Sequence, residues 1–327
     1  MLTVTHMNKK ENELAYKVGG LLYTPASNAE HIVKLIETNN QFITSIALCL
    51  EDAIQDTYLK KAEEEIKKAL LVIKNNQLDC PLLFIRVRNP QHMDELHSYL
   101  GELEQIITGY ILPKFDLSNC DEYCKQIKSY NYNLKRKIYI MPILETKSIA
   151  DSQKRINSLT GIKAKLEPIK QYVLNIRVGG NDFCNIYGIR RSVTNNIYQI
   201  GVISNILSDI INIFSDEYVV SGPVWEYFGN DDKTDWANGL KNELTYDRLN
   251  GFIGKTAIHP SQIPIIYESL KVDRKDYEDA INVIHWNDKN IAVSKSASAD
   301  RMNEQKCHTT WANQILTLAK IYGIKDN

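Results

Sequence analysis

Short apolar segments of this chain repeatedly end in residues that could do chemistry. Seven such segments end at Glu51 and Asp52, at Arg86 and Arg88, at Lys114, at Glu145, at Gly179-Gly180-Asn181-Asp182, near Ser221 with Trp225 and Glu226 beyond, and at His259. Carboxylates suit a hard, oxygen-ligated cation such as Mg2+. Arginines suit bidentate recognition of a carboxylate or phosphate. Together these residue types predict a site that binds an oxo or hydroxy acid and stabilises an enolate.

Each residue also has an ordinary structural explanation. Glu51 or Asp52 could cap a following helix, Lys114 could be solvated, and His259 could be a buried histidine with satisfied hydrogen bonds. Repetition of the pattern at seven segment ends favours a shared site. Gly180 lets the backbone approach a ligand closely, but no nucleotide-binding glycine motif accompanies it.

A parallel α/β architecture would bring these segment ends together. Eight predicted strands alternate with helical segments, at 21–23, 45–50, 82–87, 109–112, 138–143, 172–178, 217–221 and 251–258. The clearest amphipathic helix is 60–73. Eight such units predict a (β/α)8 barrel with its active site at the carboxyl ends of the strands, although a doubly wound open sheet also alternates in this way. We expect a barrel domain over 1–271 and a C-terminal helical extension over 272–327, with helices at 273–286 and 309–322 around a loop at 289–300.

Composition narrows the class of protein. The chain has 327 residues, with 39 basic and 40 acidic side chains and a formal net charge of -1. So balanced a charge offers no broad field for nucleic acid or an anionic membrane. We see no secretory leader and no apolar stretch of membrane-spanning length. The six cysteines are scattered, which predicts reduced thiols in a cytoplasmic enzyme.

Several short motifs resemble one known family. They are Leu22-Tyr23-Thr24-Pro25, Leu50-Glu51-Asp52-Ala53-Ile54, Ile85-Arg86-Val87-Arg88-Asn89, Ile111-Leu112-Pro113-Lys114, Pro142-Ile143-Leu144-Glu145-Thr146, Gly179-Gly180-Asn181-Asp182-Phe183 and the long segment from Gly251 to Ile263. In this order, over residues 20–265, the chain resembles the HpcH/HpaI aldolase and citrate lyase β-subunit family of barrel lyases.

This resemblance implies a Mg2+-dependent carbon–carbon bond lyase, or the Claisen-type reverse reaction, on an oxo acid, hydroxy acid or acyl substrate. Glu145 and Asp182 match the metal ligands, and oxygen ligands would serve Mn2+ as well. Arg86 matches the arginine that binds substrate oxygens. The acidic pair Glu51 and Asp52 and the supporting Lys114 complete the catalytic candidates, with Arg88, Gly180 and His259 as further substrate-binding candidates.

The C-terminal segment also resembles this family, in which a tail reaches the active site of a neighbouring subunit. The resemblance implies a homo-oligomer, a trimer or hexamer, in which Glu304 or His308 supplies an acid or base to the neighbour. The alternative is a surface loop before the last helix.

Two positions depart from the family pattern. Gly19 stands where an arginine is usual, and Cys49 stands where the first acid of the second motif is usual. No basic cluster suits the 3′-phosphate of coenzyme A, so a thioester substrate has little support. These departures look like a divergent branch similar to the citrate-lyase-like proteins of tellurite-resistance and stress gene clusters. The alternatives are a non-lyase enzyme that makes a specialised metabolite and a non-catalytic barrel that binds a metabolite or a partner protein.

Overall fold

A computed structural model describes residues 9–38, 40–132, 136–286, 292–296 and 300–325. The chain divides into two compact units, at residues 1–266 and 267–327. Each unit is described by itself. Among the described residues, no helix combines the length and apolar character needed to cross a membrane.

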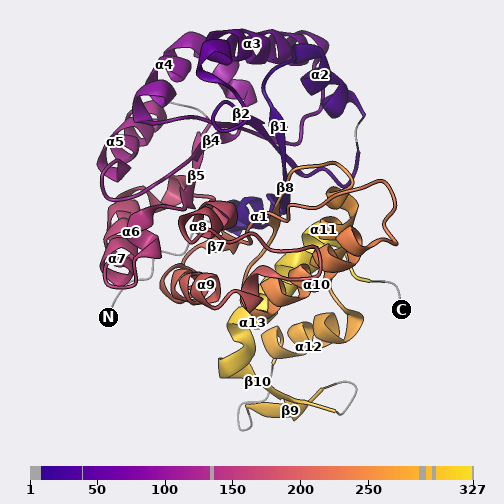
Figure 1. Ribbon diagram of the computed structural model, residues 1–327. Coiled ribbons are helices and arrows are strands. Elements are labelled where there is room, and N and C mark those ends of the chain that lie inside the picture. The colour runs from indigo at the N-terminus through magenta and orange to yellow at the C-terminus, as the bar shows by residue number, and fades with distance from the viewer. Residues whose placement is uncertain (1–8, 39, 133–135, 287–291, 297–299, 326–327) are drawn as a thin grey trace. The chain divides into compact units, whose positions relative to one another are not determined.

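The first unit is a parallel barrel, with its strands in a ring and helices outside it (Figure 1). Its strands are β1 Gly20–Pro25, β2 Ser45–Cys49, β3 Leu82–Arg86, β4 Gly109–Leu112, β5 Tyr139–Leu144, β6 Asn175–Val178, β7 Val219–Ser221 and β8 Lys255–Ala257. Their order is β7-β6-β5-β4-β3-β2-β1-β8, and a bridge between Gly222 and Lys255 brings the two end strands together. This arrangement confirms the predicted barrel and excludes the open sheet.

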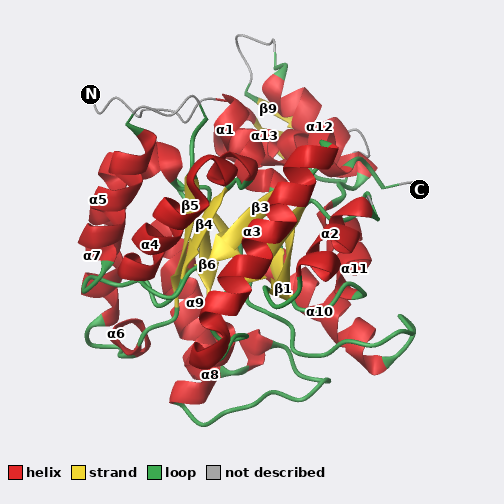
Figure 2. Cartoon of the chain, turned by 90° about the horizontal axis from the view of Figure 1, so that it is seen from above, coloured by secondary structure: helices red, strands yellow, loops and turns green. Residues whose placement is uncertain are grey.

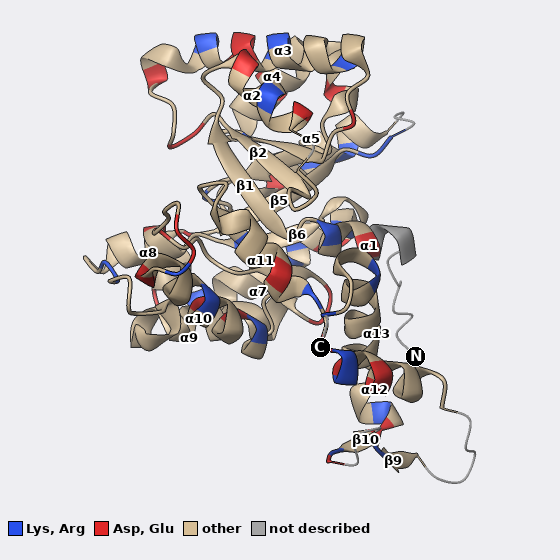
Figure 3. Ribbon diagram, turned by 90° about the vertical axis from the view of Figure 1, so that its right-hand side faces the viewer, with Lys and Arg blue, Asp and Glu red and all other residues tan. Residues whose placement is uncertain are grey.

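Helices cover the outside of the strands, as the view from above shows (Figure 2). The helices of this unit are α1 Lys9–Lys17, α2 Ala29–Glu37, α3 Leu59–Asn76, α4 Pro90–Leu100, α5 Cys120–Asn131, α6 Lys147–Ala150, α7 Arg155–Leu166, α8 Gly180–Ile186, α9 Gly201–Phe214, α10 Asp235–Leu249 and α11 Gln262–Leu270, which runs into the second unit. On α3 the apolar stripe predicted over 60–73 is buried, while its other face carries mixed charges (Figure 3). Lys61, Glu65 and Lys68 form ion pairs one helical turn apart there, which is typical of a solvated face.

The second unit holds α12 Arg274–Ile284, β9 Val293–Lys295, β10 Met302–Glu304 and α13 Gln305–Tyr322. The loop predicted over 289–300 is therefore wrong at 293–295, while 289–291 and 297–299 lie outside the described residues. The last helix also begins four residues earlier than predicted. The segment before α13 is held in place by the buried carboxylate of Asp279 on α12. This carboxylate pairs with Arg301 and accepts a hydrogen bond from Asn303 on β10 at 2.9 Å.

A buried charged network joins β8 to α10 in the barrel unit. The Lys255 ammonium, fully buried, lies 2.9 Å from Glu243 Oε1 and 2.7 Å from Asp247 Oδ2. Arg191 Nη1 pairs with the other oxygen of Glu243 at 2.9 Å, and the Tyr198 hydroxyl donates to Asp247 at 2.6 Å. Such a network is strongly coupled, because loss of one partner leaves an uncompensated charge in a water-free environment.

We predict that Lys255→Met destabilises the protein by about 3–5 kcal/mol, because two carboxylates lose their cation. The measurement is the free energy of unfolding from denaturant titration. The control is Lys34→Met on α2, which breaks the exposed Glu30 pair and should leave the unfolding midpoint nearly unchanged. Equal effects of the two variants would contradict the assigned role of the network.

Backbone packing at Gly254 joins β8 to β1. Gly254 has a φ of +74°, and a Cβ there would collide with the backbone of Gly19, whose carbonyl carbon would lie 2.9 Å away. The Gly19 carbonyl also accepts the Lys255 N–H at 3.0 Å. Because Gly251 and Gly254 both have a positive φ, the chain is not extended through them, and β8 is shorter than the predicted 251–258.

We predict that Gly254→Ala destabilises the protein by at least about 3 kcal/mol, because backbone strain and a collision with Gly19 add together. Gly188→Ala is the matched control, since Gly188 also has a positive φ but a Cβ there meets nothing within 4 Å. That variant should cost only about 1–2 kcal/mol. Thermal and denaturant unfolding of both variants measure the difference, and indistinguishable values would refute the close approach.

Candidate active site

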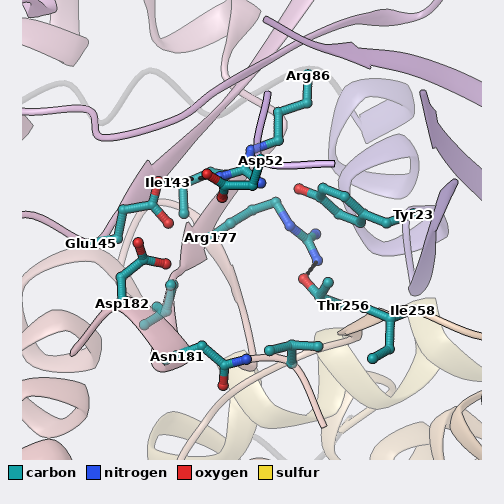
Figure 4. A pocket seen from close by; sticks show the side chains of 14 residues that line it. Tyr23, Asp52, Arg86, Ile143, Glu145, Arg177, Asn181, Asp182, Thr256 and Ile258 are labelled. Carbon is teal, nitrogen blue, oxygen red and sulfur yellow. Dashed lines mark hydrogen bonds and ion pairs between the residues drawn. The ribbon is translucent and has the colours of Figure 1, made fainter. Parts of the chain in front are cut away.

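A cavity of about 190 Å³ lies at the carboxyl ends of the barrel strands (Figure 4). Of the residues predicted from the sequence, five line it: Asp52, Arg86, Glu145, Gly180 and Asp182. They come from the ends of β2, β3, β5 and β6. The structure therefore brings together residues that are up to 130 positions apart (182 − 52) in the sequence.

Arg86 is the centre of the charged contacts in this cavity. Its guanidinium Nη2 lies 2.8 Å from Glu51 Oε2, 3.2 Å from Asp52 Oδ2 and 3.5 Å from Glu145 Oε1. Burial alone would lower the pKa of Arg86, but the surrounding acidic groups outweigh burial and raise it. The buried Arg86 Nε has no hydrogen-bond partner among the described residues, so it can donate to a ligand.

Lys114 connects two of these carboxylates from the end of β4. Its ammonium bonds Glu51, and its backbone N–H donates to Glu145 Oε1 at 2.8 Å. Lys114 adopts a φ of +48°, which is rare for a residue with a side chain. Such strained backbone concentrates at functional sites, where neighbouring contacts hold it in place.

The carboxyl groups of Glu145 and Asp182 point toward each other on one side of the cavity (Figure 4). Burial raises the pKa of Glu145 to about 8, and nearby Asp182 adds to the rise despite the opposing charge of Arg86. Burial also raises the pKa of Asp182. A buried and a partly buried carboxyl in one place favour occupation by a cation or retention of a proton.

The carboxylates of Glu145 and Asp182 fit a Mg2+ site in which the protein supplies only a few of the ligands. Among the residues that the structure describes, no three His, Cys, Asp or Glu side chains form a complete metal cage. Mg2+ usually takes one or two carboxylates and keeps water or substrate at its other positions. Gly179 leaves room for this pair, because a Cβ there would collide with Glu145 and lie 3.0 Å from Asp182 Oδ2.

The other four sequence candidates, Glu51, Lys114, Arg88 and His259, lie outside the cavity lining. Glu51 and Lys114 nevertheless contact the lining residues Arg86 and Glu145. Arg88 Nε donates to the Leu50 carbonyl at 2.8 Å, and its guanidinium pairs with Asp56. Arg88 thus fixes the segment after β2. His259 stacks on Phe228 with ring centroids 4.4 Å apart. Their predicted contact with substrate gains no support from this geometry.

Comparison with known proteins identifies the family. A family model described as a carbon–carbon bond lyase of the TIM-barrel fold matches residues 12–324. The chain belongs to this carbon–carbon bond lyase family. A comparison with curated proteins found no significant match.

Solved structures of similar fold include citrate lyase relatives. CitE from Mycobacterium tuberculosis in complex with magnesium, acetoacetate and coenzyme A is 16% identical, with a TM-score of 0.60 over 93% of this chain and 99% of that chain. A citrate lyase from Burkholderia xenovorans LB400 is 12% identical, with a TM-score of 0.68 over 94% and 93%. The citrate lyase β subunit from M. tuberculosis complexed with oxaloacetate and magnesium is 19% identical, with a TM-score of 0.51 over 78% and 98%. At these identities the likeness shows a shared fold.

The lyase cavity also contains polar residues that were not predicted from the sequence as site residues. They are Tyr23 from β1, Arg177 from β6 and Thr256 from β8. Asn181, which stands in the segment predicted at the end of β6, lines the cavity from α8. Arg177 had a signal in the sequence, because Asn175 and Arg177 are two polar residues on the same face of an otherwise apolar strand. Tyr23 and Thr256 stand within the motifs that resemble the family, but a tyrosine and a threonine are ordinary strand residues, so their types alone do not mark them as site residues.

The tail candidates lie in the second unit. Glu304 ends β10, and its backbone N–H donates to His308 Nδ1 on α13 at 2.9 Å. The alternative of a surface loop is wrong for these residues, because they belong to a strand and a helix. Their action on a neighbouring subunit stays a prediction.

We predict that Arg86→Met destabilises the lyase by about 3–5 kcal/mol at neutral pH, because the carboxylates of Glu51 and Asp52 lose a shared cation. The measurement is the free energy of unfolding. A second variant, Arg86→Met with Glu51→Gln, removes one of the orphaned charges and should recover part of the loss. Simple additivity of the two changes would show that the groups are not coupled.

Proposed function

We propose that this lyase is metal-dependent and cleaves or forms a carbon–carbon bond in a small oxo or hydroxy acid. The observation that carries the proposal is the pair of facing carboxyls, Glu145 and Asp182, beside the guanidinium of Arg86. We assign the two carboxylates as ligands of Mg2+, with Mn2+ as the alternative ion. The magnesium in the two M. tuberculosis relatives supports this assignment.

A divalent cation on Glu145 and Asp182 would supply the positive charge that polarises a carbonyl oxygen and stabilises an enolate. Arg86 complements it with its unpartnered Nε, which we expect to hold an oxygen of the same substrate. Lys114 keeps Glu145 in place through its backbone N–H. Gly180 forms part of the wall, and a Cβ there would collide with Pro223 at 2.7 Å, so only glycine lets the backbone pack this closely beside the cavity.

Glu51 and Asp52 are suited to proton transfer because their environments separate their pKa values. Burial raises the pKa of Glu51. Burial also tends to raise the pKa of Asp52, but the hydrogen bond from Glu51 and the charge of Arg86 outweigh it and lower this pKa. Of the two residues, Asp52 lines the cavity. We therefore assign Asp52 as the base and Glu51 as the residue that positions it.

In the cleavage direction, Asp52 takes the proton of the substrate hydroxyl. The carbon–oxygen bond becomes a carbonyl, and the electrons of the breaking carbon–carbon bond pass to the enolate half. The proton held by Asp52 then goes to the enolate carbon, so that atoms and charges balance. In the condensation direction the same proton moves the opposite way.

The cavity volume limits the substrate. About 190 Å³ accommodates an acid of a few carbon atoms, whereas sites for drug-sized ligands hold roughly 300–1,000 Å³. The nucleotide of coenzyme A would have to lie outside this cavity. A free acid therefore fits the site better than a thioester that is bound as a whole.

We predict that Asp182→Asn lowers the affinity for Mg2+ by more than about 100-fold, because one of two anionic ligands becomes neutral. Isothermal titration of the folded variant with MgCl2 measures this. Asp56→Asn is the control, since Asp56 is an exposed carboxylate that pairs with Arg88 outside the cavity. Undiminished Mg2+ binding by the Asp182 variant would remove the ligand assignment. Release of pyruvate, glyoxylate or acetyl-CoA from candidate substrates then tests the lyase reaction.

A further inference from the structure

Arg177 is a buried cation in the active-site cavity without an acidic partner. Its side chain is 1% exposed and lines the cavity. Nη2 donates to Thr256 Oγ1 at 2.7 Å, and Nη1 lies 3.4 Å from Asn175 Oδ1, so both acceptors are neutral. Nε has no hydrogen-bond partner, and no carboxylate forms an ion pair with Arg177 in the part of the chain that the structure describes.

Other buried cations of the barrel unit are neutralised by the protein itself. Arg86 contacts three carboxylates, and Lys255 contacts two. An uncompensated charge in a buried position is strongly unfavourable. Arginine does not escape this cost by losing its proton in a protein. The described residues therefore provide no counter-anion for Arg177, and a bound ligand would have to supply it.

The surroundings of Arg177 are arranged for such an anion. Its side chain runs from β6 across the cavity, and its guanidinium lies between Tyr23 on β1 and Thr256 on β8, away from Glu145 and Asp182 (Figure 4). Thr256 Oγ1 accepts from Arg177, so its own hydrogen is available to a ligand. The neutral phenol of Tyr23 is a second hydroxyl donor beside the same guanidinium. One cation and two hydroxyl donors are a set that a carboxylate accepts well.

We propose that Arg177, with Thr256 and Tyr23, binds a second carboxylate of the substrate and so selects acids with two anionic ends. The first end lies at Glu145, Asp182 and Arg86, and the second lies at Arg177. This inference rests on the proposed function for the position of the first end. The small cavity favours a carboxylate over a bulkier anionic group.

Oxaloacetate and pyruvate are the probes, because they differ by one carboxylate. We expect the wild-type protein with saturating Mg2+ to bind oxaloacetate about 10- to 100-fold more tightly than pyruvate, since hydrogen bonds between charged groups have that strength. Arg177→Met should abolish this preference and leave pyruvate and Mg2+ affinities within about threefold. Arg177→Lys should restore part of it, because a charge remains without the planar fork. Isothermal titration measures all of these affinities.

Stability of the ligand-free protein separates this role from a structural one. If Arg177 awaits an anion, Arg177→Met removes an uncompensated charge and should raise the melting temperature. If Arg177 supports the barrel, the same variant should lower the melting temperature. Thr256→Val keeps the shape of the residue and should weaken oxaloacetate binding with little effect on pyruvate, which provides a test if the Arg177 variants do not fold.

Equal binding of the two acids by the wild type, no binding of oxaloacetate, or an unchanged preference in Arg177→Met would overturn the proposal. Failure of the proposed function has a different signature, in which acid binding does not require Mg2+ and survives Asp182→Asn. The difference between oxaloacetate and pyruvate then still reports on Arg177 alone.

Discussion

The contact of the Arg86 guanidinium with three carboxyl groups organises the active site at the carboxyl ends of the barrel strands. Glu51 and Asp52 follow β2, Arg86 ends β3 and Glu145 follows β5, so the contact exists only when these strands are in register. Cys49 is paired with Arg86 in that register. A shift of one residue would turn Arg86 to the outer face of the sheet. Fold and active site are therefore specified by the same alignment of strands.

The two ends of the site differ in their electrostatics. Around Arg86 the carboxylates outnumber the cations Arg86 and Lys114, and Glu145 and Asp182 hold their protons more tightly than usual as a result of burial. Among the described residues, no carboxylate forms an ion pair with Arg177, whose hydrogen-bond acceptors are neutral. The protein thus offers carboxyl groups that can give up their protons to a cation at one end and an uncompensated positive charge at the other. A cation and an acid with a distant second carboxylate would neutralise both.

Much of the fold could be predicted from the sequence because the barrel repeats one local pattern. Each strand is a short apolar segment and several end in a polar residue, so eight strands and the residues Glu145 and Asp182 could be identified without contacts. Arg177 was missed because it lies inside a strand and not at its end, so that only its position on the same face as Asn175 marked it. The hairpin of β9 and β10 was missed for another reason. Its strands are three residues long and polar, and they depend on the buried Asp279, which only the tertiary structure reveals.

Backbone packing explains why glycine occupies position 19, where the family pattern usually has an arginine. Gly19 has a φ of +52°, and its backbone packs against Gly254 where β8 meets β1, so an arginine there would be strained. The guanidinium of Arg177 reaches the region between β1 and β8 from β6 instead. A side chain from β6 enters the cavity from a different direction than one from β1 would. Under the proposed assignment, the position of Arg177 relative to Glu145 and Asp182 therefore sets the length and shape of the acid that can reach both ends.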